Sequence, residues 1–175
     1  LLDRLDPGLL GAFQFVGGIR GNITEDWQFN FYVARGKYNE QQEQDGNVSV
    51  TRVESLLDAP DGGLSICEGG FDPLPAGALS ADCADYIGVL AKNTQQIEHN
   101  HAEFVVSGEV FDMPGGRASL AVGTFWQKLD YEFKADEILA SGDVAGFNAE
   151  DNIIGQTDNT DIFTELFLPL TERLG

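Results

Sequence analysis

RASLAVGTFWQ, residues 117–127, alternates between two kinds of side chain. Apolar or small groups occupy the even positions from Ala118 to Trp126, whereas the odd positions are mixed in character. Successive side chains of a β-strand point to opposite faces, so a period of two predicts a strand with one apolar and one mixed face. The preceding Pro-Gly-Gly at residues 114–116 predicts a tight turn at the start of this strand.

Four more stretches alternate in the same way, and the pattern predicts an all-β chain. The expected strands are residues 12–23, 26–37, 99–111, 117–132 and 160–169. Short turns join the first strand to the second and the third to the fourth, whereas the other two connections are long loops, residues 39–98 and 133–159. Compact soluble domains rarely contain such loops, but outer-membrane barrels combine short periplasmic turns with long extracellular loops. We therefore expect residues 1–175 to be a segment of an antiparallel up-and-down transmembrane β-barrel.

The long loop 39–98 carries local signals of its own. Residues 51–59 form an amphipathic pattern that predicts a short helix, and residues 80–87 predict a second helix with Ser80 as its N-cap. Cys67 and Cys83 lie in a Gly-, Pro- and Asp-rich stretch without the ligand spacing of a zinc site. The two cysteines are interpreted either as a disulfide formed in an oxidising compartment, worth about 3 kcal/mol, or as two unrelated thiols. The disulfide is the expectation.

The two faces of the expected strands differ in polarity. One face carries apolar side chains such as Phe29, Phe31, Leu120 and Val122, which we assign to lipid. The opposite face, assigned to the lumen, carries Gln14, Arg20, Gln28, Asn30, Glu103, Ser107, Glu109, Gln127 and Glu165. Aromatic residues are expected near strand ends, as in the girdles of barrels: Phe13, Phe15, Trp27, Phe111, Trp126 and Tyr131. Because Arg35 and Lys37 continue the lipid face, we expect Arg35 near the outer interface, where its side chain can snorkel.

The composition and motifs of the chain argue against several classes of function and partner. The 10 Lys and Arg against 29 Asp and Glu give a net charge of −19, which argues against nucleic acid and against an anionic lipid surface as partners. No nucleophile–base pair or phosphate loop stands out, so an enzyme is not expected.

Two clusters of polar residues have the side-chain types of a metal site. His99, His101 and Glu103 share a strand face, and the alternatives are a divalent metal site and a polar lining, of which we favour the lining. The Asp- and Asn-rich residues 143–161 are interpreted as a solvated loop in preference to a calcium site. No metal or cofactor is expected.

Several segments in chain order resemble the barrels of TonB-dependent receptors. They are residues 53–59, 79–87, 106–116, 139–148 and 161–170, and the resemblance extends from about Phe13 onward. It implies a large barrel of the kind that is plugged in 22-stranded transporters. It also implies energised uptake of a scarce nutrient, such as a siderophore, cobalamin or a saccharide, across the bacterial outer membrane.

The resemblance also implies partners and a larger protein. No plug-domain sequence or TonB box is found, and the chain opens with Leu1-Leu2-Asp3-Arg4. We therefore expect an internal part of a protein of roughly 700 or more residues, which meets the TonB complex through an N-terminal part upstream. Outer-membrane lipid and a small nutrient ligand are the other expected partners. The alternatives are a passive porin-like barrel and a soluble β-sandwich that binds a ligand.

Overall fold

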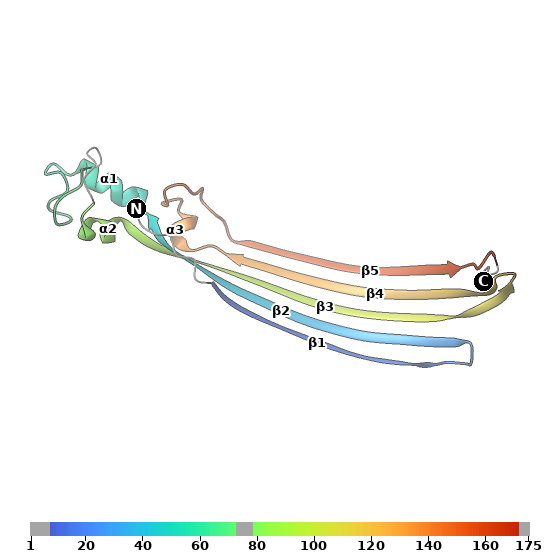
Figure 1. Cartoon of the computed structure of the whole chain (residues 1–175). Coiled ribbons are helices and arrows are strands. Elements are labelled where there is room, and N and C mark those ends of the chain that lie inside the picture. The colour runs from blue at the N-terminus through green and yellow to red at the C-terminus, as the bar shows by residue number, and fades with distance from the viewer. Residues whose placement is uncertain (1–7, 73–78, 172–175) are drawn as a thin grey trace. The chain divides into compact units, whose positions relative to one another are not determined.

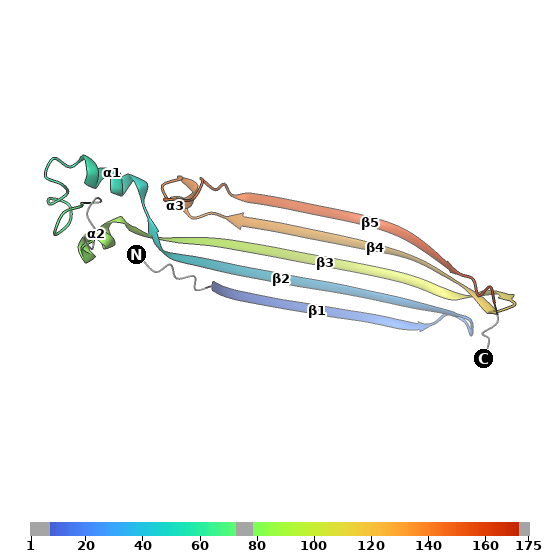
Figure 2. The same cartoon turned by 45° about the horizontal axis from the view of Figure 1, so that its top comes forward.

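The computed structural model describes residues 8–72 and 79–171 and consists mainly of one β-sheet. Five antiparallel strands lie side by side in chain order (Figures 1 and 2). The strands are β1 (Gly8–Asn22), β2 (Trp27–Val48), β3 (Gly88–Met113), β4 (Gly116–Lys134) and β5 (Ile153–Phe167). The helices are α1 (Val50–Asp58), α2 (Ala81–Ile87) and α3 (Glu137–Ala140). The predicted up-and-down order of five strands, with short helices in the connections, is confirmed.

Most of the strands are longer than the alternation predicts. β2 continues to Val48 and β3 begins at Gly88, so the connection expected at residues 39–98 is only residues 49–87. β5 begins at Ile153 instead of residue 160, and the second connection is correspondingly shorter. In these extensions both faces of the strands carry polar side chains, so the period of two disappears although the backbone ladder continues. The predicted bounds of the two loops are therefore wrong.

Some of the aromatic residues that were predicted to lie near strand ends lie within the strands instead. Because β1 begins at Gly8 and β4 continues to Lys134, Phe13, Phe15 and Trp126 lie within strands. Trp27 opens β2, as predicted. No helix among residues 8–72 and 79–171 is long and apolar enough to cross a membrane.

The chain divides into two compact units, and every strand contributes a segment to each. Among the described residues, unit 1 comprises residues 8–11, 39–72, 79–96 and 132–154, and unit 2 comprises residues 12–38, 97–131 and 155–171. The helices and the long connections belong to unit 1, whereas the short turns at residues 23–26 and 114–115 belong to unit 2.

Unit 1 has two small hydrophobic cores. Leu56 of α1 packs with the two cysteines and with Ile87 of α2, and the two helices contact each other. A second core joins Ala91 of β3 to Leu139 and Val144 of the second connection. The described parts of both connections, residues 49–72, 79–87 and 135–152, are therefore packed against small cores.

Unit 2 has almost no core. Of the hydrophobic residues that the structure describes in this unit, Ala118 alone is fully buried. Large apolar side chains are exposed instead, among them Ile19 at 64% and Ile162 at 80%. A single sheet with two open faces buries too little apolar surface to be stable alone in water. The stability of unit 2 therefore depends on the medium that contacts each face.

Candidate functional site

One face of unit 2 is apolar over most of its length. Contacts across the strands show which side chains share this face: the ring of Trp27 covers Gly108, and the ring of Phe29 covers Gly21. We call it the apolar face. Its members from β1 and β2 are Phe13, Phe15, Ile19, Trp27, Phe29, Phe31 and Val33. Those from β3, β4 and β5 are Ala102, Phe104, Val106, Val110, Ala118, Leu120, Val122, Thr124, Trp126, Ile162, Thr164 and Leu166. The predicted register is confirmed for Phe29, which shares this face with Gly21.

Charged side chains interrupt the apolar face in the parts of β2, β3 and β4 that are nearest to unit 1 in sequence. The Nζ of Lys37 lies 2.9 Å from a carboxylate oxygen of Glu98, and the Nη2 of Arg35 lies 3.6 Å from the other. On β4, Lys128 pairs with Asp130 at 3.5 Å. We call these five residues the charged border. Glu98 was missed as a partner of Arg35 because the sequence placed it in a loop.

The opposite face of unit 2 carries the side chains that were assigned to a lumen, and we call it the polar face. The amide of Gln28 donates to the hydroxyl of Ser107 over 3.4 Å, and the hydroxyl of Tyr32 donates to Glu103 over 3.4 Å. These contacts place even-numbered residues of β2 beside odd-numbered residues of β3, as the predicted register requires.

Two imidazoles, His99 and His101, lie on the polar face in β3, the central strand of the sheet. His101 stacks between Tyr32 and Phe125, with ring centroids 5.2 and 5.8 Å apart, and His99 lies 6.1 Å away. The Nε2 of His101 lies 3.7 Å from Glu103. The residues that the structure describes include no group of three His, Cys, Asp or Glu side chains spaced to hold a metal ion. The cluster is therefore held together by stacking of its own aromatic rings.

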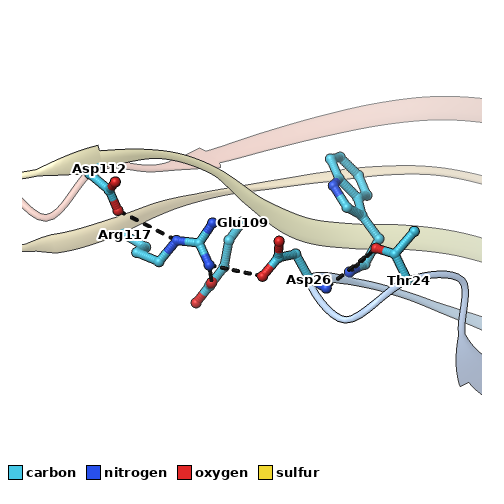
Figure 3. Close-up of polar contacts among 6 residues, drawn as sticks. Thr24, Asp26, Glu109, Asp112 and Arg117 are labelled. Carbon is cyan, nitrogen blue, oxygen red and sulfur yellow. Dashed lines mark hydrogen bonds and ion pairs between the residues drawn. The ribbon is translucent and has the colours of Figure 1, made fainter.

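Arg117 gathers carboxylates beside the short turns of unit 2 (Figure 3). Its Nη1 lies 2.8 Å from Asp26 and also contacts Glu109, and its Nε lies 3.5 Å from Asp112. The hydroxyl of Thr24 accepts from the backbone amides of Asp26 and Trp27. One guanidinium thus ties the turn at residues 23–26 to the hairpin of β3 and β4.

A disulfide links Cys67 to Cys83, with the Cα atoms 5.0 Å apart. Cys83 lies in α2, whose N-cap is Ser80, as predicted: the Ser80 hydroxyl accepts from the amide of Cys83 over 3.1 Å. α1 is capped in the same way by Ser49. The two caps, the bridge and the small core give the first long connection a defined fold in unit 1.

Asp143 fastens the second connection to the first. Its carboxylate accepts from the Ser49 hydroxyl over 2.5 Å and from the Thr51 amide over 2.6 Å. The hydrogen bond from Ser49, followed by that from Thr51, lowers the pKa of Asp143 below its ordinary value of 3.8. This anchor was missed because the sequence grouped Asp143 with the Asp- and Asn-rich residues 143–161.

The Asp and Asn residues between positions 143 and 161 do not form one cluster. The side chain of Asn152 accepts from the amide of Ala135 in unit 1, whereas Asp158 of β5 accepts from the indole of Trp126 in unit 2. The interpretation of residues 143–161 as one solvated loop is wrong from residue 153 onward, where β5 begins. Asn152 and Asp158 therefore have separate structural partners.

We expect acid to release the Asp143 anchor. Because its pKa is lowered in the folded unit, its stabilising contribution is complete above the unfolded value, near pH 4, and is lost as the pH falls through the lower folded value. Asp143→Ala should raise amide exchange at Thr51 about 10-fold at pH 7, since hydrogen bonds to a charged acceptor contribute roughly 1.5 kcal/mol or more. Asp151→Ala, which removes the same charge from an exposed site, serves as the control. Equal exchange in both variants contradicts the anchor.

No protein-family model and no curated protein matches the chain. Its function must therefore be inferred from the faces of unit 2 and the connections of unit 1.

Proposed function

We propose that the chain forms part of the barrel wall and extracellular loops of a TonB-dependent receptor in the bacterial outer membrane. The observation that carries the proposal is the pairing of an exposed apolar face with a polar face on one sheet that has almost no core. In water such a face is unfavourable by about 25 cal/mol for each Å² of apolar surface. Against lipid tails it needs no covering layer, and the polar face then lines an aqueous passage.

The length of the apolar face supports the same proposal. On β3 it runs from Ala102 to Val110, and on β4 from Ala118 to Trp126, before the charged border begins. Each run has nine residues, close to the roughly 9–11 residues of a tilted strand that spans a membrane. A soluble β-sandwich would instead need a second layer over this face, and the strands described here form a single sheet.

The connections support an orientation. Unit 2 contains the short turns, and unit 1 contains the long connections, of which residues 49–72, 79–87 and 135–152 are described. In outer-membrane barrels the short turns lie on the periplasmic side and the long loops outside the cell. The loops of unit 1 are then available to capture a nutrient, and a disulfide suits that oxidising location. Further strands paired with β1 and β5 would close the barrel.

The resemblance of residues 106–116 and 161–170 to TonB-dependent receptors supports energised uptake over passive diffusion. A porin-like barrel would share the wall but would not need TonB. Capture of the TonB periplasmic domain by the full-length protein tests this difference: retention supports the receptor, and its absence leaves the passive barrel.

Epitope insertion tests the barrel and its orientation together. An epitope placed after Gly62, in the exposed turn of unit 1, should be labelled by antibody on intact cells. An epitope placed after Glu25, in the short turn of unit 2, should be labelled only after the outer membrane is permeabilised. Recovery of both tagged proteins in the aqueous fraction would contradict the proposal.

A further inference from the structure

Unit 1 contains a cavity that the proposed function does not use. It has a volume of about 430 Å³ and is lined by residues 9–11 of β1, 39–41 of β2 and 94–96 of β3, and by Glu132 and Lys134 of β4. All of these residues belong to unit 1, so the cavity is separate from the polar face of unit 2. Small-molecule sites commonly have volumes of roughly 300–1,000 Å³. The cavity is therefore large enough for a ligand.

The pairing of β2 with β3 brings uncharged polar side chains together in this cavity. The Nζ of Lys92 lies 2.7 Å from a carboxylate oxygen of Glu43, which places these two residues opposite each other. Antiparallel partners on one face continue in steps of two residues. The next two pairs therefore join amide or hydroxyl side chains: Gln41 with Thr94, and Asn39 with Gln96. Amides and hydroxyls both donate and accept hydrogen bonds, so the lining offers both roles to a ligand.

The charges around the cavity argue against an anion as its ligand. Of the described residues that line it, Lys134 alone is a cation, and its Nζ lies 2.9 Å from the carboxylate of Glu132. Glu40 adds a second carboxylate, so two negative charges against one positive charge leave the lining at −1. The adjacent ion pair of Glu43 with Lys92 adds no net charge. A neutral ligand suits this lining, because a phosphate or carboxylate would meet a cation that is already paired.

β1 adds an apolar wall to the polar lining. Leu9 and Leu10 are exposed, and both line the cavity. Gly11 has no side chain, and apart from its chain neighbours no atom lies within 4 Å of the place where its Cβ would stand, so the cavity is open beside it. Sugar rings combine C–H surfaces, which pack against aliphatic side chains, with hydroxyls that donate and accept hydrogen bonds. An uncharged saccharide therefore matches both parts of the lining.

We propose that this cavity of unit 1 binds an uncharged saccharide. The sugar hydroxyls pair with Asn39, Gln41 and Thr94, and a C–H face of the ring packs against the leucines of β1. The amide nitrogen of Gln41 donates to Glu43 over 2.8 Å, which holds this amide in place for a sugar hydroxyl. The inference goes beyond the proposed function, because binding by unit 1 does not depend on which medium contacts the faces of unit 2.

Two strand glycines supply a matched pair of variants. Gly11→Phe fills the cavity, whereas Gly155→Phe places the same ring on β5, which does not line it. Neither glycine has a positive φ, and a Cβ at either position meets no atom within 4 Å, so both variants should fold.

Binding is measured by calorimetry on the full-length protein in a zwitterionic detergent without a sugar headgroup. The probes are the neutral trisaccharides of glucose, galactose, mannose and N-acetylglucosamine. At least one of them should bind the parent and Gly155→Phe equally. The same trisaccharide should bind Gly11→Phe at least about 10-fold more weakly, because the phenyl ring occupies its place.

A smaller change tests the hydrogen bonds of the site. Asn39→Leu keeps the size of the side chain and removes its amide, so it should weaken binding roughly 10-fold, the effect of one or two lost hydrogen bonds. Asn30→Leu, at an exposed position of the same strand in unit 2, is the control and should bind as the parent does. Trigalacturonic acid, an anionic trisaccharide, should bind at least about 10-fold more weakly than the best neutral one.

Three results would overturn the proposal: no binding of any neutral trisaccharide, equal affinity in Gly11→Phe and Gly155→Phe, or a preference for trigalacturonic acid. Because sugar binding is measured in detergent, it stands apart from the labelling of the epitopes after Gly62 and Glu25. Labelling as expected without sugar binding rejects the saccharide site alone.

Discussion

Val122→Arg is expected to prevent stable insertion of the sheet into a membrane, whereas Ala121→Arg is expected to leave it almost unchanged. Val122 is exposed on the apolar face, and its neighbour Ala121 lies on the polar face of the same strand. An arginine facing hydrocarbon near the midplane of the membrane costs about 2–4 kcal/mol, while one facing an aqueous lumen is solvated. This corresponds to a shift of roughly 30- to 900-fold in the folding equilibrium.

The measurement is the unfolding free energy of the full-length protein in lipid vesicles, followed by urea titration. Both variants add the same positive charge at adjacent positions, so the effect of net charge cancels; the strand propensities of the native Val and Ala differ by less than about 1 kcal/mol, which is smaller than the expected loss. Similar losses in the two variants would contradict the assignment of the apolar face to lipid. A larger loss of unfolding free energy for Ala121→Arg would mean that the polar face, and not the apolar face, contacts lipid.

Loss of the disulfide is expected to unfold part of unit 1 and leave unit 2 intact. The Cys67–Cys83 bridge closes a loop with a sequence separation of 16, which is worth about 3 kcal/mol by loop entropy. Both cysteines are also buried in the core around Leu56. In the double variant Cys67→Ser with Cys83→Ser, we expect cleavage by an added protease between residues 59 and 72 to rise roughly 100-fold.

The strand content of the same variant provides the control. Unit 2 contains neither cysteine, so its β-sheet signal in circular dichroism should not change. Reduction of the parent protein should reproduce the protease sensitivity, and reoxidation should reverse it. If cleavage stays at the parent level after reduction, the bridge does not determine the fold of the loop.

Alternation predicts the strands only where the two faces meet different surroundings. In unit 2 the faces differ, and the turn at residues 114–115 and the register of Gln28 with Ser107 follow from the sequence. In unit 1, residues 39–45 of β2 and 92–96 of β3 have polar side chains on both faces, as where Glu43 of β2 pairs with Lys92 of β3 at 2.7 Å. The sequence pattern contains no period there, so the extensions of β2 and β3 could not be predicted.

Local signals predicted the parts of the site that lie close together in sequence. Ser80 caps α2 and Cys67 pairs with Cys83 within one connection, so both could be predicted from neighbouring residues. Glu98 with Lys37 and Asp143 with Ser49 join residues 61 and 94 positions apart. Such pairs depend on the strand register and on how one connection meets the other, and no single segment of the sequence specifies them.

The central claim is that the apolar face of unit 2 meets hydrocarbon and the polar face meets water. Both native cysteines are in the disulfide, so a single introduced cysteine can carry a nitroxide label at each of positions 119–122 and at position 124 in turn. Gly123 is left unchanged because the ring of Phe163 covers it. In the full-length protein in vesicles, labels at positions 120, 122 and 124 should collide with oxygen, which concentrates in lipid. Labels at positions 119 and 121 should collide with a water-soluble nickel chelate. A profile without a period of two, or one in which the apolar face is shielded from both reagents, would contradict the account.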